Sequence, residues 1–525
     1  MKRAARVLLL LLAIVVAVSG CAQPQAEPKK TETPPPKEKT MIVAYPADPP
    51  SLNPIAESGD YAQAVCVNIF NKLVKFDKDF NIKPDLAKTW EIKDSGKTFV
   101  FNLETNFKWH DGKPVTSADV KWSLDTAKAV GATKSRLQDI ASIETPDDKT
   151  VVIRLNNPSG VFLSVLAWGS VQIMPKHLYD GTNFKENPYN RKPIGSGPFK
   201  FQEWKPGEYI TIVANKEYPK GKPDLDKLVI KFIPQAQSAI AALQAGEIHV
   251  LSQYSAPPFR DITRFEQDAK FKVVKWNHYT FWRLIFNMKE KPFNDVRVRQ
   301  AFAYALDREK IVQACYAGVP MAAKTAGPLS PSVAWAYNKD ATNYPYDPAK
   351  AESLLQAAGL KKNAAGVRLS CTLDFVDYLP GDKDMWLMAR DMFAKVGIQV
   401  ELKQYDAAAW NDKIMNQKKF QVSWAGTGGP DPDMLRYMFE TGGSGNPMSY
   451  SNAALDKLLN KGAQLMTIEE RKPVYYEIQD LIAKDACSIP IWNLTMVEVW
   501  NKDYQGREAY STYFADLSNI KYVGK

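Results

Sequence analysis

The feature that most constrains the fold is a regular alternation of helix-like and strand-like segments in the second half of the chain. The predicted order is helix 349–358, strand 369–375, helix 384–395, strand 398–404 and helix 407–417. Strands that alternate with helices of this length are typical of α/β architectures. The sequence therefore predicts the α/β fold class.

The rest of the chain supplies further elements of both kinds. Thr116 and Asp119 form the signature of a capped helix start, and Gly246 and Gly359 are typical helix stops. The other predicted helices are 61–73, 236–245, 295–306, 453–466 and 468–485. The other predicted strands are 41–45, 98–103, 150–155, 199–204, 209–214, 228–233, 249–251, 281–287, 490–492 and 495–500.

At 525 residues the chain is too long for one ordinary hydrophobic core, so two or three domains are expected. Hydrophobic residues make up 45% and charged residues 24%, which is typical of a globular protein. The 13 Trp, 23 Tyr and 23 Phe exceed what core packing needs. This aromatic content favours a protein that grips organic ligands.

The N-terminus has the pattern of an export signal. Lys2, Arg3 and Arg6 precede an apolar run at 7–18, which is too short to span a bilayer. The run ends in small residues before Cys21, which resembles the lipobox of bacterial lipoproteins. This resemblance implies a signal peptide over 1–21 and lipidation of Cys21; an ordinary secretory signal is the alternative.

Residues 22–40 are rich in Pro, Lys and Glu and show no apolar periodicity. Such a segment cannot bury a core, so we expect a disordered linker. No later segment is long and apolar enough to cross a membrane. We therefore expect a folded body outside the cytoplasm, attached to the bacterial cell membrane through a lipid anchor.

The charge distribution argues against a nucleic-acid site, and the cysteine positions indicate buried thiols. The net charge of +10 is spread without a dense basic run, which argues against nucleic-acid binding. Besides Cys21, the cysteines are Cys66, Cys315, Cys371 and Cys487. They are scattered and mostly flanked by apolar residues, so buried thiols are expected, although their pairing stays open.

The sequence lacks the familiar motifs of catalysis and of metal binding. The chain contains neither GxSxG nor HExxH. Gly96-Lys97-Thr98 resembles the end of a phosphate loop, but Glu91 stands where such a loop needs glycine. The 4 histidines lie far apart in sequence. We expect no enzyme activity, no cofactor and no metal site.

The stretch WAGTGGPDPD at 424–433 has the most unusual composition. It follows a predicted short strand at 420–423, and its glycines predict a turn of high conformational freedom. Trp424, Asp431 and Asp433 would be held at the end of that strand. The alternatives are a ligand-facing loop and a plain surface turn.

Several motifs together resemble one family. They are LAKTWEIKDSGKTFVFNL at 86–103, FKWHDGKPVTSADV at 107–120, IGSGPF at 194–199, KPDLD at 222–226, ALQAGE at 242–247, FNDVRVRQAF at 293–302, YDPAKA at 346–351 and PDPD at 430–433. In this order they resemble the family 5 extracellular solute-binding proteins, the peptide- and nickel-binding components of ABC importers.

The resemblance implies a two-lobed periplasmic-binding-protein-like fold of type II, cluster C. Lobe one would comprise 41–288 and 498–525, with an extra subdomain over 80–190, and lobe two would comprise 289–497. A hinge would lie near Asn287 and Glu498. Ligand would shift the populations of open and closed states.

The resemblance also implies ligand-binding residues. In peptide binders of the family, an aspartate after the equivalent of Trp424 pairs with the peptide ammonium, but here that position is Thr427. Asp431 and Asp433 could replace it or cap the next helix, and Arg436 could pair with an anionic ligand end or face solvent. Trp282 and Arg283 adjoin one lobe crossing. The ligand-binding residues expected are Tyr61, Gln63, Trp168, Trp424, Gly426, Thr427, Gly428, Asp431 and Arg436.

The function implied is that of a receptor which captures a peptide or peptide-like solute and delivers it to an ABC permease. An oligosaccharide or a nickel chelate is the alternative solute, although no histidine follows His278. An extracytoplasmic hydrolase or a peptide-sensing chaperone is the alternative of another class. A monomer is expected.

Overall fold

The computed structural model describes residues 38–168, 171–379, 381–507 and 516–524. The chain divides into Met1–Lys37 and a compact unit from Glu38 to Lys525, and only the second is described. The predicted signal peptide, Cys21 and most of the linker lie outside the described residues. In the part of the chain that is described, no helix is long and apolar enough to cross a bilayer.

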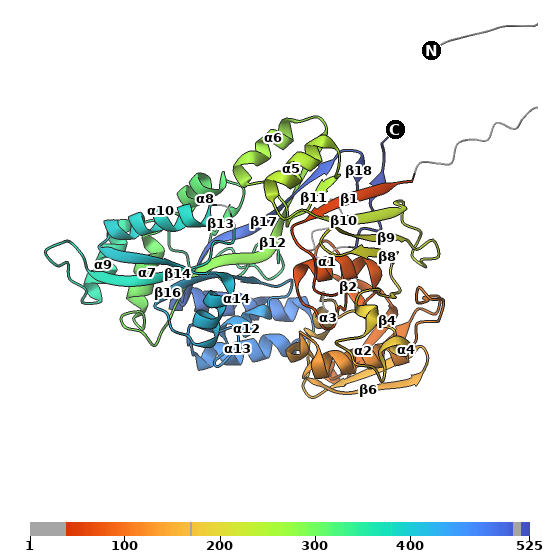
Figure 1. The fold of residues 1–525 in the computed structure, drawn as a ribbon. Helices are drawn as coiled ribbons and strands as arrows, with labels where there is room; N and C mark the ends of the chain where they lie inside the picture. The colour runs from red at the N-terminus through yellow and green to blue at the C-terminus, as the bar shows by residue number, and fades with distance from the viewer. Residues whose placement is uncertain (1–37, 169–170, 380, 508–515, 525) are drawn as a thin grey trace, which may run out of the picture. The chain divides into compact units, whose positions relative to one another are not determined.

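One large mixed sheet of 11 strands organises the unit (Figure 1). Its main path runs β15 (Ile398–Gln404), β14 (Leu369–Phe375), β16 (Val422–Gly428), β12 (Phe271–Phe286), β17 (Ser488–Asn501), β11 (Val250–Leu251), β1 (Thr40–Tyr45), β10 (Lys227–Phe232), β9 (Tyr209–Ala214) and β8 (Phe199–Lys205). The short strand β13 (Met321–Ala322) pairs with β17 outside this path.

The antiparallel strands β12 and β17 run side by side through the middle of this sheet (Figure 1). Both are longer than the sequence predicts, because polar residues interrupt their apolar pattern. The strand expected at 281–287 begins at Phe271, and the strands expected at 490–492 and 495–500 form one strand. The register between β12 and β17 shifts between Asn277 and Phe281.

Four hydrophobic clusters lie on the two sides of that register shift. One pair of clusters includes Val274 and Phe271 of β12, and the other pair includes Leu284 and Phe281. We call the residues around the first pair lobe one and those around the second pair lobe two. Each lobe has a core on both faces of its part of the sheet, which is the two-lobed α/β fold that the sequence predicted.

Lobe one carries a second sheet with its own helix. The strand order is β4 (Ala87–Lys93), β5 (Thr98–Leu103), β7 (Thr150–Leu155) and β6 (Ile140–Asp147). Helix α2 (Ser117–Val130) begins with the predicted capping box, in which Thr116 and Asp119 satisfy each other's backbone N–H groups. Two small two-stranded sheets pair β2 (Val74–Phe76) with β3 (Ile82–Pro84), and β18 (Tyr504–Gln505) with β19 (Lys521–Tyr522).

The remaining helices cover the sheets and connect their strands. In lobe one they are α1 (Asp60–Ile69), α3 (Phe162–Leu166), α4 (Lys176–Tyr179), α5 (Ala236–Ala245) and α6 (Ile262–Gln267). In lobe two they are α7 (Val296–Tyr304), α8 (Arg308–Tyr316), α9 (Pro348–Ala357), α10 (Asp382–Lys395), α11 (Ala407–Trp410), α12 (Met434–Phe439), α13 (Ala453–Gln464) and α14 (Ile468–Asp485).

Short 3₁₀ turns link several of these elements. They are η1 (Asp94–Gly96), η2 (Lys134–Leu137), η3 (Pro188–Asn190) and η4 (Phe259–Asp261). The helix expected at 407–417 instead changes at Asn411 into the π-helical turn η5 (Asn411–Asn416). Helix α14 has the bounds that the sequence predicted.

The four cysteines in the described residues are free thiols. Cys66, Cys371 and Cys487 are buried, which confirms the prediction of buried thiols for these three, whereas Cys315 is half-buried. Burial raises the pKa of the Cys371 thiol to about 12. The buried thiols therefore stay protonated and serve as small apolar groups in the cores.

Candidate functional site

A cavity of about 400 Å³ lies where β12 passes from lobe one to lobe two. It falls within the range of about 300–1,000 Å³ that is usual for small-molecule sites. The residues that line it are Ser58, Asp60, Gln63, Thr133, Arg136, Trp168, His278, Tyr279, Thr280 and Leu494. They come from the start of α1, from η2, from the segment after α3, and from β12 and β17.

The β12 segment forms one wall because its pairing with β17 is interrupted there. Tyr279 packs against Trp168, with 6.0 Å between ring centroids, and lies 3.8 Å from the His278 ring. Nδ1 of His278 accepts a hydrogen bond of 3.2 Å from the backbone N–H of Thr280. Burial lowers the pKa of His278 to about 3, so the imidazole is neutral at physiological pH.

Arg136 supplies the positive charge of the cavity. Its guanidinium Cζ lies 4.1 Å from the centroid of the Trp168 ring, a cation–π arrangement. Its only polar contact within the described residues is from Nη2 to Met434 Sδ, at 3.9 Å. The half-buried guanidinium thus faces the cavity without a carboxylate partner among the described residues.

Gln63 and Trp168 are the expected ligand-binding residues that the structure brings into this cavity. The Gln63 side chain is already fixed, because its amide donates to the carbonyls of Pro54 and Glu57 and its oxygen accepts from Gln172. Tyr61 instead packs against Tyr254 and Tyr45, with 5.1 Å and 6.3 Å between ring centroids.

The glycine-rich stretch has a different structure from the predicted turn. Residues up to Gly428 belong to β16, which pairs with β12 from Val422 opposite Phe286 to Gly428 opposite Thr280. None of Gly426, Gly428 and Gly429 has a positive φ. The prediction of a loop with high conformational freedom is therefore wrong.

These glycines are needed for close packing. A Cβ on Gly426 would lie 2.8 Å from the Trp282 ring, and a Cβ on Gly428 would lie 2.1 Å from the backbone oxygen of Tyr279. Position 426 therefore lets an indole lie against the backbone. The glycine at position 428 lets β12 lie close to β16 at the point where β12 forms the cavity wall.

Trp424 is a core residue in this structure, with 1% of its surface exposed. It stacks on Trp282, with 4.3 Å between centroids and 28° between planes, and Trp386 meets it edge-on at 5.3 Å. Thr427 is half-buried, and its hydroxyl donates to the carbonyl oxygen of Gly426. Neither residue lines the cavity described above.

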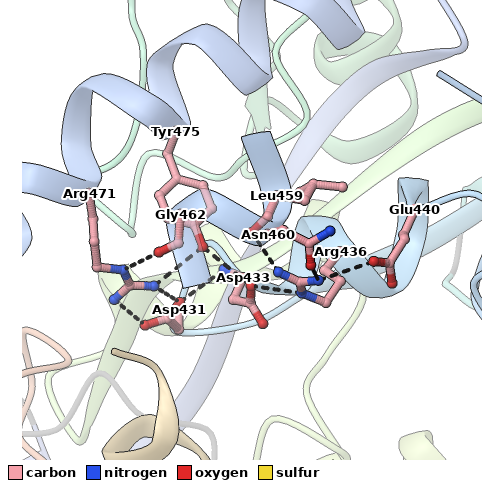
Figure 2. A network of polar contacts seen from close by, with 9 residues as sticks. All are labelled: Asp431, Asp433, Arg436, Glu440, Leu459, Asn460, Gly462, Arg471 and Tyr475. Carbon is pink, nitrogen blue, oxygen red and sulfur yellow. Dashed lines mark hydrogen bonds and ion pairs between the residues drawn. The ribbon is translucent and has the colours of Figure 1, made fainter. Parts of the chain in front are cut away.

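The two charged candidates of this region are held by neighbouring side chains (Figure 2). Asp431 forms a two-pronged ion pair with Arg471, at 2.6 Å and 3.0 Å, and accepts a hydrogen bond from Ser164 of α3 at 3.1 Å. The contact with Ser164 joins the two lobes. Both oxygens of Asp431 are therefore engaged within the protein.

Arg436 is engaged in the same way (Figure 2). It donates to Asp433, Glu440 and Asn460, and to the carbonyl of Leu459 at 2.5 Å. Asp433 precedes α12, but its side chain makes no capping hydrogen bond and instead contacts Arg436 and Tyr475. Its burial raises its pKa.

The sequence reasoning missed Arg136, Tyr279 and His278, because their segments are separated by more than a hundred residues and carry no motif. Arg283, noted beside the crossing, is 1% exposed, and its Nε and Nη1 have no hydrogen-bond partner in the described structure. No group of three or more His, Cys, Asp and Glu in the described ranges is placed to hold a metal ion.

Comparison with known proteins shows the family. Residues 81–449 match the bacterial extracellular solute-binding proteins, family 5. A Brucella ovis protein assigned to peptide binding for an ABC transporter is 34% identical over 403 residues, 73% of each chain.

Two solved structures share the fold. The ABC transporter substrate-binding protein CtaP of Listeria monocytogenes has a TM-score of 0.83 and 27% identity, covering 93% of this chain and 100% of its own. NikZ of Campylobacter jejuni, in complex with Ni(L-His), has a TM-score of 0.79 and 28% identity, covering 92% and 99%. These matches confirm the resemblance seen in the sequence motifs: the chain belongs to the family 5 bacterial extracellular solute-binding proteins, the solute receptors of ABC transporters.

Proposed function

We propose that this protein captures a peptide or peptide-like solute in the cavity beside the crossing strands and delivers it to a membrane permease, without catalysing a reaction. The observation that carries the proposal is the composition of the cavity. Arg136 and Asp60 provide opposite charges, while Trp168 and Tyr279 provide aromatic surface. Peptides carry the same combination of charged ends and apolar side chains, and the Brucella ovis relative is assigned to peptide binding.

The residues expected from the family keep separate roles in this proposal. Trp168 would contact the solute directly, and Gln63 would hold the start of α1 in place. Trp424, Gly426, Thr427, Gly428, Asp431 and Arg436 would shape the edge of lobe two, and Tyr61 would extend the aromatic surface of lobe one. Absence of a carboxylate at position 427 favours recognition of the peptide ammonium elsewhere, and Asp60 is the acidic group of the cavity.

The positions of the cores support a proposal that shifts the hinge from the places implied by the family. Asn287 donates to the carbonyl of Lys418 within lobe two, and Glu498 pairs with Arg507 beside lobe one. We therefore place the hinge between these residues and the register shift, at 277–280 and 493–495. The extra subdomain at 80–190 would be built on the β4-β5-β7-β6 sheet.

Export, anchoring and oligomeric state complete the proposal. The protein would be lipidated on Cys21, anchored to the cell membrane through that lipid, separated from the membrane by the 22–40 linker, and monomeric. Mass spectrometry of the membrane-extracted protein should then find an N-terminal peptide that begins at Cys21 and carries acyl chains. An N-terminal peptide without acyl chains would contradict lipid anchoring.

A thermal-shift screen tests the solute class, because binding to the folded state raises the melting temperature by mass action. The panel contains dipeptides, oligopeptides, cello- and manno-oligosaccharides and nickel–histidine. Stabilisation by peptides is expected. Stabilisation by sugars alone, or by the nickel chelate alone, would overturn the peptide assignment, and consumption of any solute during incubation would overturn the non-enzymatic role.

A further inference from the structure

We propose that Arg136, stacked on Trp168, binds a carboxylate of the solute and restricts the cavity to solutes with an anionic end. This inference rests on the proposed function, because it assumes that the solute occupies this cavity. It names the chemistry that the solute must present there.

The first support is the unused donor capacity of Arg136. A guanidinium has five N–H donors arranged for two-pronged contact with a carboxylate. Arg471 and Arg299 use theirs: Arg471 pairs with Asp431, and Arg299 donates to the carbonyls of Phe293, Asp485 and Ala486. Arg283 and Arg308 also leave donors unused in the described structure, but neither of them lines the cavity. In the described residues, Arg136 has only its long contact with Met434 Sδ.

The second support is positioning. The cation–π contact with Trp168 holds the guanidinium at the cavity, because its Cζ lies over a ring that belongs to the same lining. Thr133 contributes a hydroxyl group to the same lining, whereas the hydroxyl of Thr280 is engaged with Nδ1 of His278 at 3.0 Å. A carboxylate placed against the edge of Arg136 would therefore find a further hydrogen-bond donor in the same lining.

The third support is electrostatic. Burial lowers the pKa of Arg136, which means that the protein removes water from the cation without supplying a carboxylate in contact. Arginine stays protonated in proteins, so the charge is desolvated and not neutralised. A solute carboxylate would restore the lost interaction in a site where water screens charges poorly.

The other titratable side chains of the lining indicate which charges the solute carries. His278 is neutral, and Asp60 would repel a solute that carried only negative charge. The lining thus fits a dipolar solute better than an inorganic anion. Among peptides, the group in question is the C-terminal carboxylate.

The experiment compares alanyl-phenylalanine with its C-terminal amide by calorimetric titration of the full-length mature protein. Wild type should bind the acid about 10- to 100-fold more tightly than the amide, the usual range for a charge-assisted hydrogen-bond pair. Arg136→Gln should lose this preference, and Arg136→Lys should keep part of it. Lys134→Gln is the matched control, because Lys134 is exposed on the same turn and does not line the cavity.

Two results would overturn the inference. If wild type binds amide and acid equally, or if Arg136→Gln keeps the preference, the carboxylate is not recognised by Arg136 while the peptide function stands. If only uncharged oligosaccharides bind, both the inference and the peptide function fail. A melting temperature of Arg136→Gln close to that of wild type shows that the variant is folded.

Discussion

Arg471 holds Asp431 through two parallel hydrogen bonds, of 2.6 Å and 3.0 Å, and the side chains of these residues are 5% and 14% exposed. Asp431 comes from the stretch that the sequence marks as ligand-facing. Its carboxylate instead pairs with an enclosed arginine of α14, which also donates to the carbonyl of Gly462 in α13. The pair is therefore a structural element of lobe two.

The first prediction concerns the stability of that pair. Asp431→Asn removes the carboxylate charge paired with enclosed Arg471, and breaking a buried pair in this way costs about 3–5 kcal/mol. The melting temperature of the solute-free protein should fall clearly. Glu440→Gln is the control, since Glu440 pairs with Arg436 near the surface and an exposed pair contributes about 0–1 kcal/mol. Equal melting temperatures for the two variants would contradict the role given to Asp431.

The second prediction concerns the glycines of β16. Gly428→Ala places a methyl group against the backbone oxygen of Tyr279, so β12 and β16 must separate beside the cavity. Overpacking of this kind costs about 1–3 kcal/mol. Gly59→Ala is the control, because nothing lies within 4 Å of its added Cβ and its φ of −67° suits alanine.

The measurement is chemical unfolding of both glycine variants beside wild type. The Gly428 variant should unfold at lower denaturant concentration than the Gly59 variant, whose loss is limited to the weaker N-cap preference of alanine at the start of α1. If Gly428→Ala unfolds like wild type, position 428 is not closely packed against β12, which would favour the flexible turn that the sequence predicts.

The third prediction concerns Arg283, whose enclosed Nε and Nη1 have no acceptor in the described residues. Burial lowers its pKa to about 10, and the Phe281 and Phe439 rings lie beside it, with centroids at 5.4 Å and 5.7 Å. Replacing an unpaired buried cation by an apolar side chain removes a desolvation cost. Arg283→Met should therefore keep or raise the melting temperature without solute. A fall in melting temperature as large as that of Asp431→Asn would show that Arg283 stabilises the folded protein and would contradict this prediction.

The fourth prediction concerns pH. His278 has a folded-state pKa of about 3, whereas an unfolded histidine titrates near 6.5. Between these values the unfolded chain binds a proton that the folded protein does not, so stability falls as pH drops from about 6.5. The slope is about 1.4 kcal/mol per pH unit.

Melting temperatures of wild type and His278→Gln at pH 7 and pH 5 test this linkage. The melting temperature of wild type should fall more between pH 7 and pH 5 than that of His278→Gln, because all other titrating groups are common to both proteins. Parallel losses would mean that the imidazole is protonated or solvated in the folded state.

Most of the fold could be predicted from the sequence where local signals agree. Periodicity gave α14 and β14 their bounds, and the Thr116 capping box fixed the start of α2. The length of β12 could not be predicted, because the polar segment at 277–280 breaks the strand pattern while the neighbouring strands β16 and β17 hold the backbone extended.

The site was harder to predict, because it depends on contacts between distant segments. Glycines allow either a positive φ or close packing, and only the neighbours Trp282 and Tyr279 decide which applies at 426 and 428. An aspartate looks alike in sequence whether it meets a ligand or Arg471. Arg136 lies on a short polar turn that resembles any exposed turn until Trp168 is placed beside it.

The most direct test of the central claim is a crystal structure of the protein with the solute that stabilises it most in the thermal screen. The account predicts a peptide-like ligand in the cavity between Trp168 and Tyr279, with a carboxylate on Arg136. A ligand bound away from this cavity, or one with no charged group at Arg136, would contradict it.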